Sequence, residues 1–199
     1  NAEIREKTQI QIDRWNKVIS QINPKGLLLH ILNTAGAMCY DVSNSNMRRA
    51  GIALYGLYPD LPDDSKIKKP DLKPVMSLKA RIVNIHEAKD GEGISYGHTF
   101  IAHGSRKIAT VPLGYADGVP RGLSNKISGC LNGKEVPQVG NITMDQMMFD
   151  ITGVDAQLGD VVTLLDETHS IDEWAKILGT INYELTCRLK VRLPRVYTR

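Results

Sequence analysis

The pattern of hydrophobic residues changes once along the chain, after Pro59, and this change constrains the fold more than any other feature. Before it, a charged segment with apolar residues at helical spacing (3–22) leads into a short continuous apolar run (27–32). A brief helix and a second buried run (51–57) follow. Such runs suit parallel strands buried on both faces, and parallel strands need crossover helices between them. The first part of the chain therefore predicts repeating β/α units.

After this point the sequence is typical of antiparallel sheet. Residues 60–74 are rich in proline, aspartate and lysine, which indicates a linker or a domain boundary. Short strand-like segments then follow closely, separated by turns, and Asn132-Gly133 is the strongest hairpin signal among them. We expect strands over 76–87, 92–101, 106–113, 127–131, 134–138, 146–151, 160–165, 184–190 and 195–198.

One helix interrupts these strands. Ser170 is suited to its N-cap and Glu173 follows three residues later, which is the pattern of a capping box. Together the two halves predict an α+β chain. We expect residues 1–65 to form the end of a β/α barrel of the TIM type, and residues 66–199 to form a mostly antiparallel, barrel-like β domain.

The composition argues against several classes of function. A net charge of +3, spread along the chain, does not favour a nucleic-acid surface. No stretch approaches the roughly 20 apolar residues that a membrane span needs. The three cysteines include no CxxC pair, which favours reduced thiols and a cytoplasmic protein. The five histidines form no recognisable metal-binding motif, so we expect no metal site.

Three motifs in the second half carry the most specific signal. In the middle one, two glycines and a proline favour a tight turn that would orient Tyr115 and Arg121. A lone Ser-Tyr-Gly is most simply a strand tyrosine, because a tyrosine with a pKa of about 10 needs positive charge and a closed site to act as a base. The motifs are Gly93-Ile94-Ser95-Tyr96-Gly97, Gly114-Tyr115-Ala116-Asp117-Gly118-Val119-Pro120-Arg121 and Val139-Gly140-Asn141-Ile142-Thr143-Met144-Asp145-Gln146.

Phosphate-binding chemistry is available in the first half. Thr34 lies just past the apolar run 27–32, and Gly51 and Ile52 open the second run. Ligands of β/α barrels bind at the carboxyl ends of the strands, and a hydroxyl with free backbone N–H groups suits a phosphate dianion. A simple helix cap and a simple glycine bend remain open as alternatives.

In order and spacing, these motifs resemble the C-terminal half of the bacterial alanine racemases, a family of enzymes that use pyridoxal phosphate (PLP). The resemblance covers residues 27–199. It implies a small amino-acid substrate, D-alanine for peptidoglycan, and a head-to-tail homodimer. It also implies that the lysine bonded to the cofactor lies upstream of Asn1, in an N-terminal barrel segment, so we expect this chain to hold an incomplete active site.

The resemblance implies roles for residues of the three motifs. Tyr96 matches the catalytic acid/base that acts on one face of the substrate, with the cofactor lysine on the other. Backbone N–H groups at Met144 and Asp145 match those that bind the substrate carboxylate. The narrow opening to the site would be lined by Tyr115, Arg121, Asn141 and Ile181.

Cofactor contacts are implied as well. Arg49 matches an arginine that donates to the pyridine nitrogen, and His30 matches a histidine behind it, although a core histidine is an equal alternative. Arginine stays protonated, so the ring nitrogen must remain unprotonated, which weakens the ring as an electron sink and disfavours transamination. The phosphate would be held by Thr34, Gly51, Ile52 and Tyr183.

Two alternatives stay open. Many family members carry arginine where this chain has Asn141, and the loss of that charge makes a serine or dual alanine/serine racemase of the vancomycin-resistance type credible. Such proteins carry a membrane domain, so that reading implies a membrane-tethered location. An alternative of another class is a non-catalytic β-domain module, because the PLP lysine is not in this chain.

Overall fold

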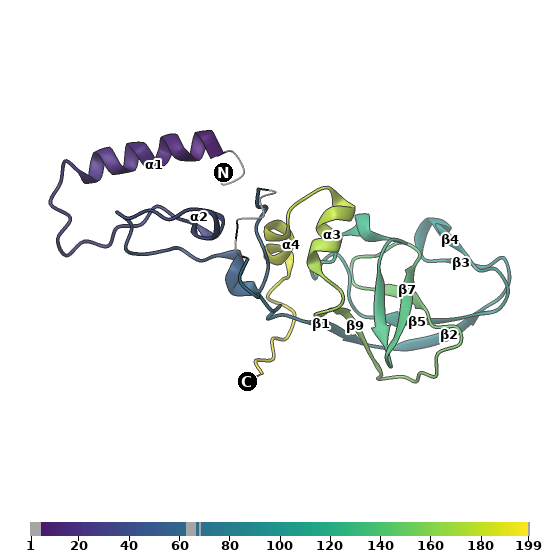
Figure 1. Cartoon of the computed structure of the whole chain (residues 1–199). Coiled ribbons are helices and arrows are strands. Elements are labelled where there is room, and N and C mark those ends of the chain that lie inside the picture. The colour runs from purple at the N-terminus through teal and green to yellow at the C-terminus, as the bar shows by residue number, and fades with distance from the viewer. Residues whose placement is uncertain (1–4, 63–66, 68, 199) are drawn as a thin grey trace. The chain divides into compact units, whose positions relative to one another are not determined.

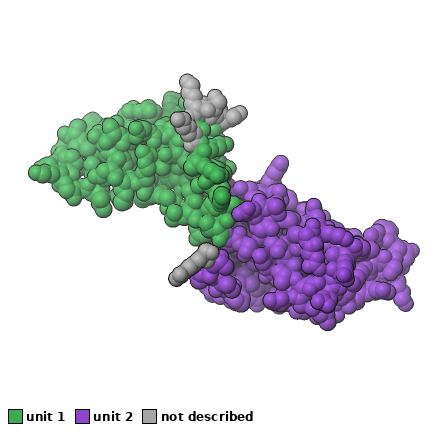
Figure 2. Space-filling model, turned by 60° about the horizontal axis from the view of Figure 1, so that its bottom comes forward, with its two compact units in different colours: residues 1–75 green, residues 76–199 purple. Residues whose placement is uncertain are grey.

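The computed structural model describes residues 5–62, 67 and 69–198, and the chain divides into two units. Unit 1 comprises Asn1–Val75 and unit 2 comprises Met76–Arg199, drawn in green and purple in Figure 2. The boundary expected between residues 65 and 66 lies outside the described residues. Each unit is described by itself below.

Unit 1 is built on one amphipathic helix. The helix expected over 3–22 is α1 (Arg5–Ile19), whose buried residues are Ile12 and Ile19. Ile12 packs in a small core with Leu32 and Val42. A second helix, α2 (Thr34–Cys39), follows the extended segment, and its N-cap Asn33 accepts a hydrogen bond from the N–H of Gly36. Helix, extended segment and short helix therefore follow in the predicted order (Figure 1).

The strand predicted over 27–32 is wrong in one respect, because this extended segment forms no strand ladder. It runs beside residues 46–49. The Asn46 side chain bonds the N–H of Leu29 and the carbonyl of Leu27, and the N–H of Arg49 donates to Leu32. A parallel strand in the interior of a sheet pairs with a strand on each side and is covered on both faces. Within the described part of unit 1, residues 46–49 are the one neighbouring segment and form no ladder with it, and Leu28 is 74% exposed.

The second predicted strand, 51–57, is also wrong. Residues Ile52–Tyr55 form a 3-10 helix, η1, which ends at Gly56 in the left-handed conformation. A β-carbon at Gly56 would lie 1.8 Å from the carbonyl oxygen of Lys73, so only glycine fits there. Glycines on both sides of this short apolar run allow the tight turn, which the hydrophobic pattern alone does not reveal.

Unit 2 contains the antiparallel sheet that the sequence predicts. Seven strands pair in the order β1-β9-β6-β7-β8-β5-β2, and β3 pairs with β4 in a separate hairpin. Every pairing is antiparallel. The strands are β1 (Leu78–Arg81), β2 (Asn84–Ala88), β3 (Gly93–Ile94), β4 (Phe100–Ile101), β5 (Arg106–Val111), β6 (Ser128–Leu131), β7 (Lys134–Val139), β8 (Met147–Asp150) and β9 (Val161–Leu165).

The two edge strands of the sheet are consecutive in the chain. Only Ile82 and Val83 separate β1 from β2. The N–H of Ile82 donates to Asp160 beside β9, whereas the N–H of Val83 donates to Thr110 in β5. One continuous segment therefore passes from one edge of the sheet to the other and curls it into a barrel-like domain (Figure 1). The predicted α+β class is confirmed.

The core of unit 2 fills both faces of the central strands. Ala109 of β5 faces Phe149 of β8, and both side chains are fully buried. On the other face of β5, Ile108 joins a cluster with Ile94 of the β3–β4 hairpin and Val139 of β7. The hairpin is thereby fixed against the sheet, and this contact positions the segment between β3 and β4.

Local turn chemistry explains most of the remaining elements. Asn132 and Gly133 both have positive φ (51° and 76°) and join β6 to β7, as predicted. The strand predicted over 92–101 is interrupted by η2 (Tyr96–His98), because Ser95, Gly97 and His98 all have positive φ. Extended pairing is impossible with that geometry.

At the end of unit 2 the helix predicted after Ser170 is confirmed. It is α3 (Ile171–Leu178), and the Ser170 side chain accepts from the N–H of Asp172. The predicted strand 184–190 is wrong, because residues Asn182–Arg188 form a helix, α4. Glu184 and Arg188, one helical turn apart, form an ion pair there. The strand predicted over 195–198 is wrong as well; this segment has no ladder partner and is exposed.

Candidate active site

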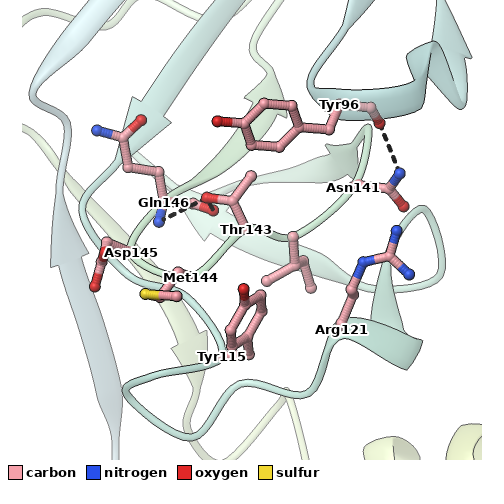
Figure 3. Close-up of a pocket in the computed structure, with 9 residues that line it drawn as sticks. Tyr96, Tyr115, Arg121, Asn141, Thr143, Met144, Asp145 and Gln146 are labelled. Atoms are coloured by element: carbon pink, nitrogen blue, oxygen red, sulfur yellow. Dashed lines mark hydrogen bonds between the residues drawn. The ribbon is translucent and has the colours of Figure 1, made fainter.

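A pocket of about 440 Å³ in unit 2 brings residues of all three motifs together (Figure 3). The motifs supply it from the tip of the β3–β4 hairpin, the turn after β5 and the loop between β7 and β8. Ile181 and Tyr183, at the start of α4, are not among the residues that line it. Among the predicted site residues, those that do line it are Tyr96, Tyr115, Arg121, Asn141, Met144 and Asp145.

Tyr96 stands on a strained turn at the hairpin tip. Its side chain is 78% exposed. Ser95, just before it, has φ 65° and ψ −179°, a region that is almost restricted to glycine. The Asn141 amide donates to the carbonyl oxygen of Tyr96 at 2.7 Å, drawn as the dashed line between these two residues in Figure 3. This segment is thus held by side chains from a different loop.

The turn that carries Tyr115 packs closely on the loop that carries Met144. A β-carbon on Gly114 would lie 2.3 Å from the carbonyl oxygen of Thr143, so the two backbones touch. The N–H of Tyr115 donates to Thr143 and the N–H of Ala116 donates to Met144. The position of Tyr115 is therefore fixed by the same loop that is predicted to bind the substrate carboxylate.

Two backbone N–H groups in this loop have no hydrogen-bond partner among the described residues. They belong to Met144 and Asp145, the central residues of a turn closed by bonds between Thr143 and Gln146. A turn of this kind can offer adjacent N–H groups to an anion. Their predicted contact with a substrate carboxylate stays a prediction that this geometry permits.

Arg192 is a residue of this region that sequence reasoning missed. Its Nε donates to Asp117 at 2.6 Å, and its Nη2 donates to Asp145 at 2.6 Å. The other oxygen of the buried Asp117 accepts from the N–H of Gly114. Hydrogen bonds from Arg192 to Asp117 and Asp145 raise the pKa of the guanidinium further above its ordinary value. The Asp145 carboxylate is therefore engaged within the protein.

No local signal could have revealed this pairing. Arg192 lies 75 residues from Asp117 and 47 residues from Asp145. The sequence predicts only a strand over 195–198 in the closing segment, and charges so far apart in sequence cannot be paired without the fold. The tight turn around Asp117 was the only available hint.

In unit 1, Arg49 and His30 are in contact. Arg49 Nη1 lies 2.8 Å from His30 Nδ1 and also donates to the His30 carbonyl oxygen at 3.2 Å. Because a guanidinium has only donors, His30 Nδ1 must be the acceptor, which leaves the proton of the neutral ring on Nε2. His30 is exposed rather than part of the core. Its predicted role behind Arg49 stays a prediction.

Thr34 and Gly51 also meet in unit 1. The N–H of Gly51 donates to Thr34 Oγ1 at 2.8 Å, and Thr34 is buried. The Thr34 oxygen is used as an acceptor, so its O–H can still donate. The N–H groups of Ile52 and Ala53 precede the first internal hydrogen bond of η1, from Leu54 to Gly51. These donors suit a phosphate group, and with Arg49 they fit PLP chemically.

Two expected absences can be examined only in the described residues. There, no group of three His, Cys, Asp or Glu side chains is arranged to hold a metal ion. Over the same ranges, every helix is too short or too polar to cross a bilayer.

Comparisons with known proteins agree with these features. The model of the alanine racemase N-terminal domain matches residues 1–59, and that of the C-terminal domain matches residues 75–197. The alanine racemase of Nostoc sp. is 44% identical over 191 residues, which cover 92% of this chain and 49% of the relative. The chain thus spans about half the length of the curated relatives it matches.

Solved structures give the same result. Alanine racemase of Clostridium difficile 630, in complex with cycloserine, has a TM-score of 0.84 and 38% identity, covering 96% of this chain and 52% of that one. Alanine racemase of Bartonella henselae, with covalently bound pyridoxal phosphate, has a TM-score of 0.81 and 29% identity, covering 98% and 53%. The fold corresponds to that of the amino-acid racemases, a class of isomerases. Within that class, the chain belongs to the alanine racemase family.

Proposed function

We propose that this chain contributes one part of a PLP-dependent racemase that interconverts L-alanine and D-alanine, supplying D-alanine for peptidoglycan. The observation that carries the proposal is the pocket of unit 2, which unites Tyr96, Tyr115 and the Met144–Asp145 turn from three separate segments. The names of the relatives support alanine as the substrate.

In this proposal Tyr96 moves the α-proton. Its phenol hydroxyl donates a proton to one face of the substrate α-carbon, or its phenolate accepts a proton there. The N–H groups of Met144 and Asp145, which have no partner among the described residues, bind the substrate carboxylate and so orient the α-carbon toward Tyr96. Tyr115, Arg121 and Asn141, which line the pocket, restrict the size of the substrate. For Ile181, which lies outside the lining, this role stays a prediction.

Unit 1 would hold the cofactor. PLP, when bound, supplies an electron-withdrawing ring that makes the α-C–H of the substrate acidic. Within unit 1, Thr34, Gly51 and Ile52 would hold its phosphate. The phosphate contact expected for Tyr183 stays a prediction. Arg49 would donate to the ring nitrogen and keep it unprotonated, which favours racemisation over transamination. The structure from Bartonella henselae, whose PLP is bound covalently, supports this cofactor.

The assembly that we propose is a head-to-tail homodimer in the cytoplasm, in which Tyr96 serves the site of the partner subunit. The exposure of Tyr96 and Met144 in this chain supports that arrangement, because both would be covered by a partner. A partner would also close the site and lower its dielectric constant, which proton transfer by a tyrosine requires.

A serine or dual alanine/serine racemase is the second candidate. It is favoured by Asn141, a neutral residue that lines the pocket where many family members carry arginine. A more polar, uncharged opening would tolerate the hydroxyl group of serine. If this racemase were of the vancomycin-resistance type, it would be tethered to a membrane by a further domain.

The decisive experiment compares this chain alone with a chimera. In the chimera, the chain replaces the matching C-terminal half of the Nostoc racemase, whose N-terminal half is retained. Both are incubated with PLP and L-alanine, and D-alanine is measured. We expect turnover by the chimera and none by the chain alone. A chimera that folds and binds PLP without turnover would favour the non-catalytic module, whereas turnover by the chain alone would contradict the incomplete site.

A further inference from the structure

The backbone before Tyr96 is in a conformation that this sequence does not favour by itself. Ser95 lies in a region of φ and ψ that non-glycine residues almost never occupy, and His98 has φ 46°. Such a turn persists only where the surroundings hold it. The hydrogen bonds around residues 95–99 therefore explain why the tyrosine stands where it does.

Asn141 holds the beginning of this turn by two hydrogen bonds, one that it donates and one that it accepts. Its side-chain amide donates to the Tyr96 carbonyl at 2.7 Å, and its own carbonyl accepts from Ser95 Oγ at 2.7 Å. Gly140, which precedes it, has φ 75°, and a β-carbon there would lie 2.6 Å from the Ile94 carbonyl oxygen. The two segments therefore touch, with no room for a larger residue at position 140.

Asn125 holds the end of the same turn. Its Nδ2 donates to Thr99 Oγ1 at 3.0 Å, and its Oδ1 accepts from the N–H of Gly140 at 2.6 Å. Gln138, which is 2% exposed, accepts from the N–H of Asn125 and donates to the Gly140 carbonyl. A single network of amide side chains thus connects both ends of the turn to the loop after β7.

We propose that Asn141 and Asn125 are positioning residues that hold the 95–99 turn in one conformation and so fix the direction of the Tyr96 phenol. Neither residue takes part in proton transfer. The effect on catalysis rests on the proposed function, whereas the fixation of the turn does not. The network contains only amide and hydroxyl groups, none of which titrates near neutral pH.

The first test measures amide hydrogen exchange in the 199-residue chain, with N141D as the variant. Aspartate is nearly isosteric with asparagine but turns a donor into an oxygen that faces the Tyr96 carbonyl, which can only accept. We expect exchange of the His98 amide, which donates to the Ser95 carbonyl within the turn, to rise roughly tenfold, the loss of about one hydrogen bond, with the sheet unchanged. Q146E is the matched control, because it adds the same charge to the same pocket without contacting the turn.

Equal exchange of the His98 amide in N141D and the parent chain would overturn the proposal, whatever the activity. Faster amide exchange across the whole sheet would mean that N141D destabilises unit 2. In that case, the T99V variant provides the second test. T99V removes only the hydroxyl that Asn125 bonds. Faster exchange of the His98 amide in T99V, with the sheet unchanged, supports the proposal, and unchanged exchange of that amide overturns it.

The second test uses the chimera with the Nostoc N-terminal half in D₂O. A misplaced Tyr96 should slow α-proton exchange of one alanine enantiomer by tenfold or more in N141D, while exchange of the other enantiomer continues. Equal losses for both enantiomers would show a general structural effect and overturn the positioning role. A parent chimera without any activity would refute the proposed function. Amide exchange in the 199-residue chain would still test whether Asn141 and Asn125 hold the 95–99 turn.

Discussion

At the scale of the residue, Tyr96 and Asn141 show how much of this site depends on backbone shape rather than on side-chain type. Tyr96 has no buried charged partner within the described part of unit 2; its position follows from a strained turn and from one hydrogen bond, from Asn141 to the Tyr96 carbonyl. A motif search finds the tyrosine, but only the structure shows what directs it.

Replacement of Tyr96 by Phe tests its chemistry directly. L- and D-alanine have equal free energies, so kcat/KM must be equal in the two directions, and α-proton exchange with solvent is the better measure. In the chimera, we expect Tyr96→Phe to abolish racemisation while one enantiomer still exchanges its α-proton, because the base on the opposite face remains. Similar exchange of both enantiomers would show that Tyr96 is not a one-sided base.

Substitutions of Asn141 also test the preference for alanine over serine. Asn141→Arg adds positive charge and bulk at the pocket, so we expect the ratio of kcat/KM for alanine over serine to rise several-fold. Asn141→Gln is the matched control, since it lengthens the side chain and keeps an amide donor but adds no charge. If arginine leaves the ratio unchanged, the proposed link between the neutral opening and serine fails.

Arg192 connects two segments of the pocket through Asp117 and Asp145. Arg192→Ala leaves the buried Asp117 without its cation and frees the Met144–Asp145 turn, so we expect a lower Tm of the chain and a raised KM in the chimera. Arg188→Ala is the control, because its ion pair with Glu184 is exposed on both sides. A larger loss of Tm in Arg188→Ala would contradict this assignment.

At the scale of the element, sequence patterns succeeded where local chemistry decides the structure. Asn132-Gly133 accepts positive φ at both positions, and Ser170 caps α3 with its own hydroxyl. The patterns failed where distant partners decide. Residues 27–32 have the composition of a strand but no strand neighbours on both sides. Residues 182–188 form a helix that buries Leu185 and bonds Asp172 of α3 through Asn182, contacts that alternation does not encode.

The same limit applies to the pocket. Its tyrosines and the Met144 turn were predicted from motifs whose order and spacing are specific to the family. Arg192 and the bonds from Asn125 could not be predicted, because each joins charges or amides that are far apart in the chain. Such contacts form only when folding brings these distant residues together, so local sequence patterns do not reveal them.

The turn between β9 and α3 should make unit 2 sensitive to acid. Burial alone would raise the pKa of Asp166, but hydrogen bonds from His169 and Thr168 outweigh it and hold that pKa well below its ordinary value. Because the folded pKa is depressed, this contribution is present above the unfolded pKa of about 4 and is lost as pH falls further.

Asp166→Asn keeps an acceptor but cannot titrate. We therefore expect the Tm difference between the parent chain and Asp166→Asn to be largest at pH 6 to 7 and to shrink as pH falls from about 5 to 3, followed by thermal unfolding monitored by circular dichroism. A difference that stays constant over this pH range would show that the Asp166 carboxylate adds no stability.

At the scale of the whole molecule, the two units differ in how completely their backbone is paired. In unit 2, β5 and β8 are central strands with fully buried side chains such as Ile108 and Phe149. In unit 1, the extended segment 27–32 has no ladder, and Leu27 and Leu28 are exposed. Backbone pairing therefore protects the central strands of unit 2 more than it protects residues 27–32 of unit 1.

Amide hydrogen exchange of the 199-residue chain measures this difference. We expect the amides of β5 and β8 to exchange slowest, with those of residues 27–32 faster by about a hundredfold or more, because unladdered backbone opens at little cost. The amides of α1 serve as an internal reference for unit 1. Equal protection of 27–32 and β5 would mean that the extended segment is paired in solution.

The passage of one segment, 78–88, from one edge of the sheet to the other also bears on aggregation. An unpaired strand edge is a template on which another chain can add a strand. Here the two edge strands are only four and five residues long, and they carry the charged residues Lys79, Arg81 and Glu87. A strand from another chain could pair with only a few backbone groups at these edges, and it would meet the charged side chains there. The 78–88 connection that closes the β domain therefore also protects it from ordered self-association.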